Sequence, residues 1–274
     1  MIGYCVAMNP ELASFRFRVS IPAAHLKVPY CFGVTGSPTF FYKEGHPALA
    51  RSLKTGVVYD VVNDHFTGTH AADYHAMVAV AQTVTACSDE MAEVVRAATG
   101  REAVVIDDPY ECSQRPAAVP SDFVLWFGHG ANIPTLKPYA DTPNLRVMSN
   151  VKGAIPWSRV KEMSALSQAG VVLLTGKPTA STNRIVKAIR SGRFVVTPGG
   201  IPGWDQFGEY CWIGDVRAGI EWALNNREEA CKKISQGQGY ISETFSPNLI
   251  AAKWMEVFDL TSGRATSDRT AGSV

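Results

Sequence analysis

A run of polar residues between positions 177 and 184 is the part of this sequence best suited to hold a charged ligand. It follows the apolar run VVLLTG at 171–176, which is typical of a buried strand, and it leads into a helical pattern. Free backbone N–H groups and the positive end of the helix dipole favour an anion at such a helix start. Simple helix capping is an equal alternative for these residue types. The residues in the run are Lys177, Thr179, Ser181, Thr182, Asn183 and Arg184.

Two further loops are expected to contribute to the same site. The strand-like run FVLWF at 123–127 is followed by GHGAN, in which the glycines let a ligand approach the backbone closely. A second glycine pair follows the strand-like run FVVT at 194–197. Open parallel sheets bind ligands where the carboxyl ends of their strands meet, so we expect these loops to line one cleft. For the histidine, an ordinary loop residue bonded to a neighbouring carbonyl is the alternative. The residues concerned are Gly128, His129, Gly130, Asn132, Gly199 and Gly200.

The N-terminal half offers residues for a second substrate. Asp64 and His65 stand just past the predicted strand at 57–63, where such a pair can orient a hydroxyl group or remove its proton. A turn with an exposed histidine is the alternative reading. Ser14, Arg16 and Arg18 follow the first predicted strand, and we expect them to line an acceptor site.

Strand-like and helical segments alternate along the whole chain, which predicts an α/β fold with parallel sheets built from βαβ units. In the first half, strands are expected at 2–8, 30–35, 39–43, 57–63, 83–88 and 103–108, and helices at 12–26, 46–54, 70–81 and 89–99. In the second half, strands are expected at 123–129, 145–150, 171–176, 194–200 and 210–214, and helices at 132–138, 158–170, 181–192 and in three stretches up to 258. Asp60, inside a strand, is predicted to be structural.

A proline-containing segment at 109–122 separates two such alternating patterns and predicts two domains. We assign residues 1–117 to an acceptor-side domain and 118–258 to a donor domain, with the last helix returning to the first domain. The polar tail at 259–274 is predicted to be disordered.

Composition excludes several classes of protein. The chain of 274 residues is 46% hydrophobic and 19% charged, which argues against a disordered protein. No apolar run reaches the roughly 20 residues of a membrane span, and the N-terminus lacks a signal-peptide pattern, so a cytoplasmic location is expected. Six scattered cysteines predict free thiols and no metal site. The net charge of +1 indicates no general attraction to nucleic acid.

The order of these motifs resembles that of GT-B glycosyltransferases, in the large retaining family that uses nucleotide sugars. The resemblance rests on WFGHGAN at 126–132, GKPTASTNRIVKAIRSGRFVVTPGG at 176–200 and YCWIGD at 210–215, with support from ELASFRFRV at 11–19 and from YDVVNDHF at 59–66. It implies two Rossmann-like lobes that face each other across a cleft. The C-terminal lobe would bind the donor, a UDP- or GDP-sugar, and the N-terminal lobe would bind the acceptor.

The resemblance also implies roles for individual residues. Departure of the nucleoside diphosphate requires stabilisation of growing negative charge, which fixed cations and helix N–H groups supply without a metal. Lys177 is the expected catalytic cation, together with Asp64 and His65 on the acceptor side. The paired glutamates of the family fall at Thr179 and Lys187, so the glutamate that normally bonds the nucleotide ribose is replaced by a lysine.

Three functions remain open at this point. The first is a metal-independent glycosyltransferase that needs no cofactor beyond its nucleotide sugar and acts on a glycan or small-molecule hydroxyl. The second is a phage-type glycosyltransferase that acts on hydroxymethylated bases in DNA. The third is a nucleotide-binding protein without turnover, which the missing glutamates favour.

Overall fold

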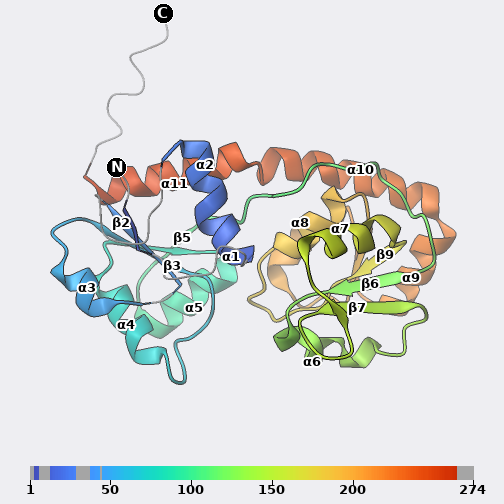
Figure 1. Ribbon diagram of the computed structural model, residues 1–274, viewed down its shortest axis with the longest axis horizontal. Helices are drawn as coiled ribbons and strands as arrows, with labels where there is room; N and C mark the ends of the chain where they lie inside the picture. Colours follow the sequence, from blue (N-terminus) through green and yellow to red (C-terminus); the bar gives the residue numbers. More distant parts are fainter. Residues whose placement is uncertain (1–2, 6–12, 29–37, 44, 264–274) are drawn as a thin grey trace, which may run out of the picture. The chain divides into compact units, whose positions relative to one another are not determined.

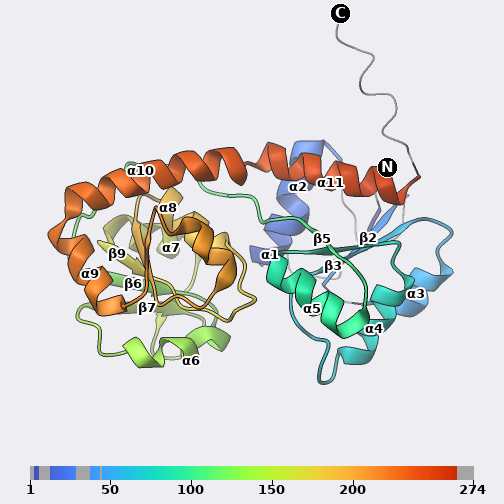
Figure 2. The same cartoon turned by 180° about the vertical axis from the view of Figure 1, so that it is seen from behind.

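The computed structural model describes residues 3–5, 13–28, 38–43 and 45–263, and they form two α/β units (Figures 1 and 2). Unit 1 contains the described residues up to Pro109 together with those from Phe245 onward, and unit 2 is Tyr110–Thr244. The strand expected at 30–35 and the tail after Gly263 lie outside the described residues. No described helix has the length and apolar character that crossing a bilayer requires.

Unit 1 is built on a parallel sheet of five strands in the order β1-β2-β3-β4-β5. Its strands are β1 (Gly3–Cys5), β2 (Thr39–Tyr42), β3 (Val57–Val61), β4 (Thr83–Ala86) and β5 (Val104–Val105). Its helices are α1 (Ala13–Phe15), the π-helical turn Arg16–Ser20, α2 (Ile21–Leu26), α3 (Pro47–Ser52), α4 (Ala71–Val80), α5 (Asp89–Thr99) and α11 (Pro247–Thr261).

Alternating side chains of the central strands form two apolar layers in unit 1, because successive residues of a strand point to opposite faces. Phe40 and Val58 pack with residues of α2 and α11. Phe41 and Tyr59 pack on the other face with residues of α4 and α5. Figure 1 shows α2 and α11 on one side of this sheet and α3, α4 and α5 on the other.

A buried ion pair joins the N-terminal helical segment of unit 1 to its sheet. Arg18 donates from Nε to Oδ2 of Asp60 at 2.9 Å and from Nη2 to Oδ1 at 2.6 Å. Thr85 donates a further hydrogen bond of 2.7 Å to Asp60, and the Arg18 guanidinium lies 4.9 Å from the ring centroid of Trp254 in α11. Burial by itself would lower the pKa of Arg18, but the attraction of Asp60 outweighs it and the pKa is raised.

This contact corrects one prediction and confirms another. Arg18 is only 1% exposed, so the prediction that it lines an acceptor site is wrong. Sequence spacing alone does not separate it from Arg16, which is half-buried. The structural role predicted for Asp60 is confirmed, because its side chain is fully buried and binds Arg18 and Thr85.

Unit 2 is built on a parallel sheet of six strands in the order β11-β10-β9-β6-β7-β8. The strands are β6 (Val124–Phe127), β7 (Leu145–Ser149), β8 (Ile155–Pro156), β9 (Val171–Leu173), β10 (Phe194–Thr197) and β11 (Trp212–Ile213). The helices are the 3-10 turn η2 (Gly130–Asn132), α6 (Ile133–Leu136), η3 (Lys137–Tyr139), α7 (Arg159–Gln168), α8 (Asn183–Arg190), η4 (Pro202–Phe207), α9 (Val216–Asn225) and α10 (Arg227–Thr244). In Figures 1 and 2, α7 and α8 lie on the opposite side of this sheet from α6. The short strand β8 had no counterpart in the sequence-based prediction.

The boundary between the two units lies between Pro109 and Tyr110, earlier than the boundary predicted at residue 117. Part of the proline-containing segment packs on unit 2, where Arg115 N–H donates to the carbonyl of Arg190 at 2.9 Å and Ala118 N–H donates to that of Gly192 at 3.0 Å. Gly192 has a φ of 76°, and a Cβ at this position would lie 2.1 Å from the carbonyl oxygen of Pro116. At the other end, α11 continues to Thr261, so the first residues of the predicted disordered tail are helical.

The ion pair inside unit 1 yields a stability prediction. Asp60→Ala leaves the Arg18 charge buried without its main partner, and we expect the free energy of unfolding to fall by about 3–5 kcal/mol. Glu93→Ala, which removes the exposed ion pair with Arg96, should leave it nearly unchanged. Urea denaturation of both variants tests this, and equal losses would contradict the assignment.

Candidate functional site

The predicted donor residues gather at the carboxyl edge of the sheet in unit 2. Strands β10, β9 and β6 are neighbours and run parallel, so the loops that follow them leave the sheet at one edge. The loop after β9 contains Thr175, whose hydroxyl accepts hydrogen bonds from Trp126 Nε1 at 2.9 Å and from Thr135 at 2.8 Å. These bonds fix the loops after β6 and β9 against each other.

Arg184, in the first turn of α8, is bound to the ends of two of these strands. Its Nη2 donates to the carbonyl oxygen of Thr175 at 2.8 Å, and its Nη1 donates to that of Phe127 at 3.3 Å. A Cβ added at Gly128 or at Gly176 would lie 3.1 Å from the guanidinium nitrogens. Glycine at these two positions therefore makes room for the guanidinium, which sequence analysis did not foresee.

Among the residues that the structure describes, none neutralises the charge of Arg184. Burial lowers the pKa of Arg184 to about 10, and no carboxylate among the described residues pairs with it. The guanidinium carbon also lies 5.6 Å from the centroid of the Trp204 ring. A partly buried cation that is bonded only to neutral groups attracts an anionic ligand.

At the start of α8, the side chain of the N-cap residue accepts no hydrogen bond from the backbone N–H groups of the first turn. Thr182 stands at the N-cap, but its side chain makes no capping hydrogen bond. The residue is 3% exposed, and its Oγ1 has no hydrogen-bond partner among the described residues. By contrast, Ser158 caps α7 and Asp215 caps α9 through their side chains. The capping alternative is therefore not realised by Thr182, and an anion is a suitable partner for these N–H groups.

The other residues of this loop differ in exposure. Lys177 is exposed and forms no ion pair with any residue that the structure describes. Its carbonyl oxygen accepts a hydrogen bond of 2.9 Å from Ala180 N–H, which closes a turn around the half-buried Thr179. Ser181 and Asn183 are half-buried, and the carbonyl of Ser181 accepts a hydrogen bond of 3.2 Å from Trp204 Nε1.

The loop after β6 is held by a residue that sequence analysis missed. Asn150, directly after β7, accepts a hydrogen bond of 2.8 Å from Gly130 N–H. Its amide nitrogen lies 3.2 Å from His129 Nε2, and His129 Nδ1 accepts a hydrogen bond from Ala131 N–H at 3.2 Å. His129 is exposed, and the carbonyl of Asn132 accepts a hydrogen bond of 2.7 Å from Thr135. No sequence spacing connects Asn150 to this loop.

The third loop requires glycine for its backbone. Gly199 and Gly200 have φ values of 84° and 72°, in the region that other residues rarely adopt. A Cβ at Gly199 would also lie 3.3 Å from Ile213, whereas the space beside Gly200 is open. The loop thus offers its backbone at the same edge of the sheet as α8.

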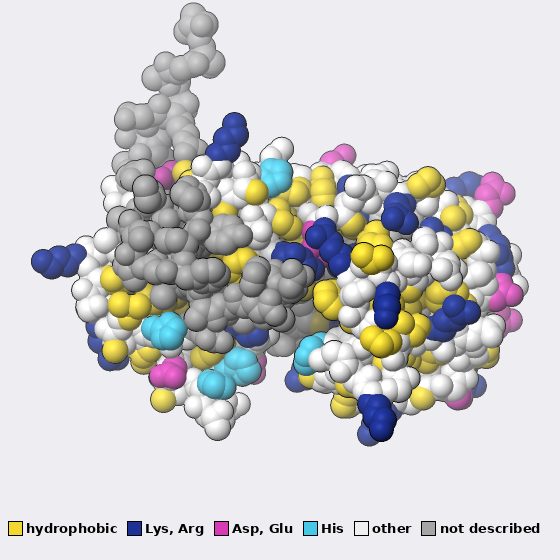
Figure 3. All heavy atoms as spheres, viewed as in Figure 1, with side chains coloured by type: hydrophobic (Ala, Val, Ile, Leu, Met, Phe, Trp, Pro, Cys, Tyr) yellow, Lys and Arg dark blue, Asp and Glu magenta, His cyan; other side chains and the backbone are white. Residues whose placement is uncertain are grey.

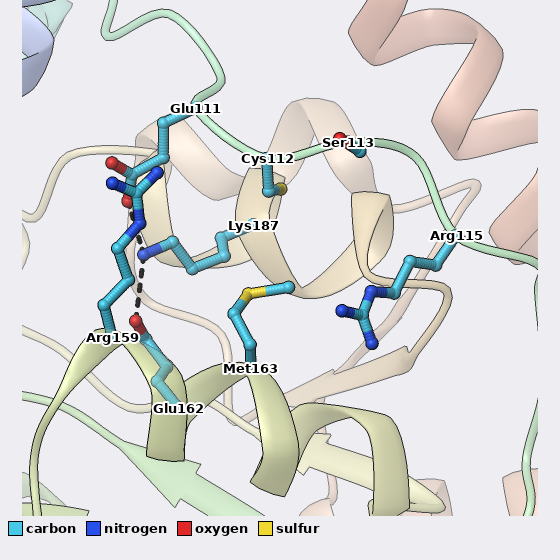
Figure 4. A pocket seen from close by; sticks show the side chains of 8 residues that line it. All are labelled: Glu111, Cys112, Ser113, Arg115, Arg159, Glu162, Met163 and Lys187. Carbon is cyan, nitrogen blue, oxygen red and sulfur yellow. Dashed lines mark hydrogen bonds and ion pairs between the residues drawn. The ribbon is translucent and has the colours of Figure 1, made fainter.

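Lys187 has partners that the sequence did not reveal. Figure 4 shows its Nζ between two carboxylates, 2.6 Å from Glu111 and 3.1 Å from Glu162. These side chains, with Arg159 and Met163, line a cavity of about 190 Å³. The glutamate expected at position 187 is thus replaced by a cation that binds two glutamates from other segments.

The predicted acceptor residues lie in unit 1. Asp64 is exposed, and its side chain accepts a hydrogen bond of 3.3 Å from Phe66 N–H. The ring centroid of His65 lies 5.6 Å from that of His70 and 5.3 Å from that of Tyr74. Ser14 and Arg16 are half-buried in the N-terminal helical segment. In the portions of the chain that the structure describes, no group of three or more His, Cys, Asp or Glu side chains is arranged to hold a metal ion.

Comparison with known proteins places the chain by its fold. No protein-family profile matches it, and no curated protein sequence is recognisably similar. Alr3699/HepE from Anabaena, solved in complex with UDP-glucose, matches with a TM-score of 0.66 at 14% identity, over 94% of this chain and 99% of that one. TarM matches with a TM-score of 0.58 at 12% identity, over 81% of this chain and 55% of that one.

A third solved structure extends the comparison. An alpha-glucosyltransferase in complex with UDP-glucose and DNA containing an abasic site matches with a TM-score of 0.55 at 8% identity, over 80% of this chain and 79% of that one. The chain therefore has the GT-B type of fold, and the predicted pair of parallel α/β lobes is confirmed.

The buried Arg18 and the half-buried Arg184 should respond differently to substitution. Arg184→Met removes two hydrogen bonds to neutral carbonyls and leaves no orphan charge, so the free energy of unfolding of the ligand-free protein should fall by less than about 2 kcal/mol. Arg18→Met leaves Asp60 buried without its counter-ion and should cost about 3–5 kcal/mol. Urea denaturation compares the two variants, and a larger loss for Arg184→Met would contradict the view that its charge is reserved for a ligand.

Proposed function

We propose that this protein is a glycosyltransferase that moves a hexose from a nucleotide sugar to an acceptor hydroxyl. The observation that carries the proposal is Arg184, a cation at a helix start that pairs with no carboxylate of the residues that the structure describes. A diphosphate that carries a nucleoside and a sugar supplies the missing negative charge.

The arrangement suits the departure of a nucleoside diphosphate. Negative charge grows on the diphosphate as its bond to the sugar breaks, and fixed donors stabilise that charge without reorganising. Arg184 and the N–H groups at the start of α8 would meet it from the protein side. The Thr182 hydroxyl, which has no partner among the described residues, would donate to a phosphate oxygen. Lys177, on the preceding turn, would bring a mobile cation to the leaving group.

UDP-glucose is the donor that we favour. Two of the structural neighbours, the Anabaena protein and the alpha-glucosyltransferase, were solved with this compound. The Gly199–Gly200 loop is proposed to receive the sugar, because its exposed backbone leaves space for hydroxyl groups. Asp64 and His65 are proposed to orient the acceptor hydroxyl and to take its proton.

The acceptor is proposed to be a glycan or a small molecule, with DNA as the second candidate. The DNA in the structure of the alpha-glucosyltransferase supports the second candidate, and unit 1 has exposed cations at Lys27, Arg51 and Lys54. Figure 3 shows Lys and Arg side chains scattered over the visible face among apolar and uncharged ones. A gel shift on duplex DNA that weakens steeply with salt would favour DNA, because phosphate contacts release counterions.

Turnover is the first test of the proposal. We expect UDP-glucose to be hydrolysed slowly, or transferred to an acceptor, with the same rate in the presence and absence of EDTA. Arg184→Met should lower kcat/KM roughly 100-fold or more, since it removes a fixed donor to the leaving group. Failure of the wild-type protein to turn over or bind any nucleotide sugar would overturn the proposal, whereas binding without turnover would favour the non-catalytic alternative.

Lys177→Ala separates a catalytic cation from a binding one. If Lys177 meets charge that grows in the transition state, kcat should fall roughly 10- to 100-fold while the Kd for UDP-glucose changes less. Steady-state kinetics and calorimetry give the two numbers. Lys232→Ala, an exposed lysine on α10 of the same unit, serves as the control and should change neither. A kcat equal to that of wild type would remove Lys177 from the catalytic group.

A further inference from the structure

Trp204 connects two of the loops that form the candidate site. It lies in the 3-10 turn η4, just after the Gly199–Gly200 loop, and is 1% exposed. A buried indole N–H usually has an acceptor, and here the acceptor is the carbonyl oxygen of Ser181 in the loop before α8, at 3.2 Å. We propose that Trp204 is a positioning residue that holds Arg184 and the start of α8 in place for the donor diphosphate, an inference that rests on the proposed function.

The contact between Trp204 and Arg184 orients the cation without cancelling its charge. The guanidinium carbon lies 5.6 Å from the centroid of the ring, within the range of a cation–π interaction. A carboxylate in the same place would orient the guanidinium equally well, but it would neutralise the charge that an anionic ligand needs. An aromatic ring fixes the group and leaves its full positive charge available. This explains why a tryptophan, rather than an acidic residue, lies beside Arg184.

The same turn also packs against the base of the loop before α8. The backbone N–H of Trp204 donates to the carbonyl oxygen of Ile201 at 2.8 Å, which closes the turn. The Ile201 side chain lies so near Gly176 that a Cβ there would be 3.3 Å from its Cδ1. The loops after β9 and β10 thus pack against each other, and Trp204 lies at their contact. A substitution of Trp204 should therefore weaken diphosphate binding at the start of α8, although we assign the indole no direct contact with the diphosphate.

A role in packing alone is the rival explanation, and substitutions separate the two. Trp204→Phe keeps an aromatic ring over Arg184 and removes the hydrogen bond to Ser181, whereas Trp204→Leu removes both contacts. Trp212→Phe is the matched control, because the Trp212 indole nitrogen lies in the same unit and has no hydrogen-bond partner among the described residues. Binding of UDP and of inorganic pyrophosphate is measured by calorimetry. In parallel, NMR of the Arg184 guanidinium N–H groups, which donate from Nη1 to Phe127 and from Nη2 to Thr175, reports whether the side chain is still held.

We expect Trp204→Leu to weaken UDP binding about tenfold or more, and Trp204→Phe to have an intermediate effect. Trp212→Phe should bind like wild type. The hydrogen-bonded Arg184 Nη–H groups should exchange slowly with water in the wild-type protein and much faster in Trp204→Leu, or in Trp204→Phe if the leucine variant does not fold. An unchanged Arg184 signal, or equal weakening by Trp212→Phe, would overturn the proposal. If wild-type protein binds no nucleotide at all, the proposed function fails, and the Arg184 signal then decides the role of Trp204 by itself.

Discussion

The positive charge of Arg184, which pairs with no carboxylate in the described part of the chain, is the constraint around which the candidate site is arranged. Arg184 is held by the carbonyl oxygens of Phe127 and Thr175, each at the end of a different strand, and by the ring of Trp204. Glycines at 128 and 176 leave space for it. Each of these partners orients the guanidinium and none neutralises it, so the protein keeps a cation whose burial has lowered its pKa. Such an arrangement costs stability and is explained most simply by a ligand that supplies the opposite charge.

Comparison of three cations shows how the surroundings decide their roles. Arg18 is bound to Asp60 by two hydrogen bonds and holds unit 1 together. Lys187 lies between Glu111 and Glu162. Only Arg184, among these three, is bound to neutral groups. Residue type and helical position are similar for Lys187 and Arg184, which are on the same helix. The presence or absence of a carboxylate therefore separates a structural cation from one that is available to a ligand.

The two ends of α8 contact different parts of unit 2. Its first turn faces the loops at the sheet edge, whereas its last turns hold the segment that enters unit 2 from Tyr110. Arg190 lies 3.6 Å from the centroid of the Tyr110 ring and donates to the carbonyl of Cys112 at 3.2 Å. Lys187 binds Glu111 in the same segment. These contacts explain why the segment belongs to unit 2, although in the sequence it separates the two alternating patterns. They also show that the lysine at position 187, where the resemblance places a glutamate, forms ion pairs of its own with Glu111 and Glu162.

The sequence by itself determined the alternation of strands and helices, the parallel sheets and the loops at the strand ends that carry the candidate site. These features follow from local periodicity, from glycine and from the order of segments, which a single chain displays directly. The resemblance to GT-B glycosyltransferases arose from the same order and is confirmed at the level of the fold. Tertiary structure alone decided that Arg18 is buried, that Asn150 holds the loop after β6, and that Trp204 lies against Arg184. These contacts join residues that are distant in the chain, so their formation depends on how strands and helices pack and leaves no periodic signal in the sequence.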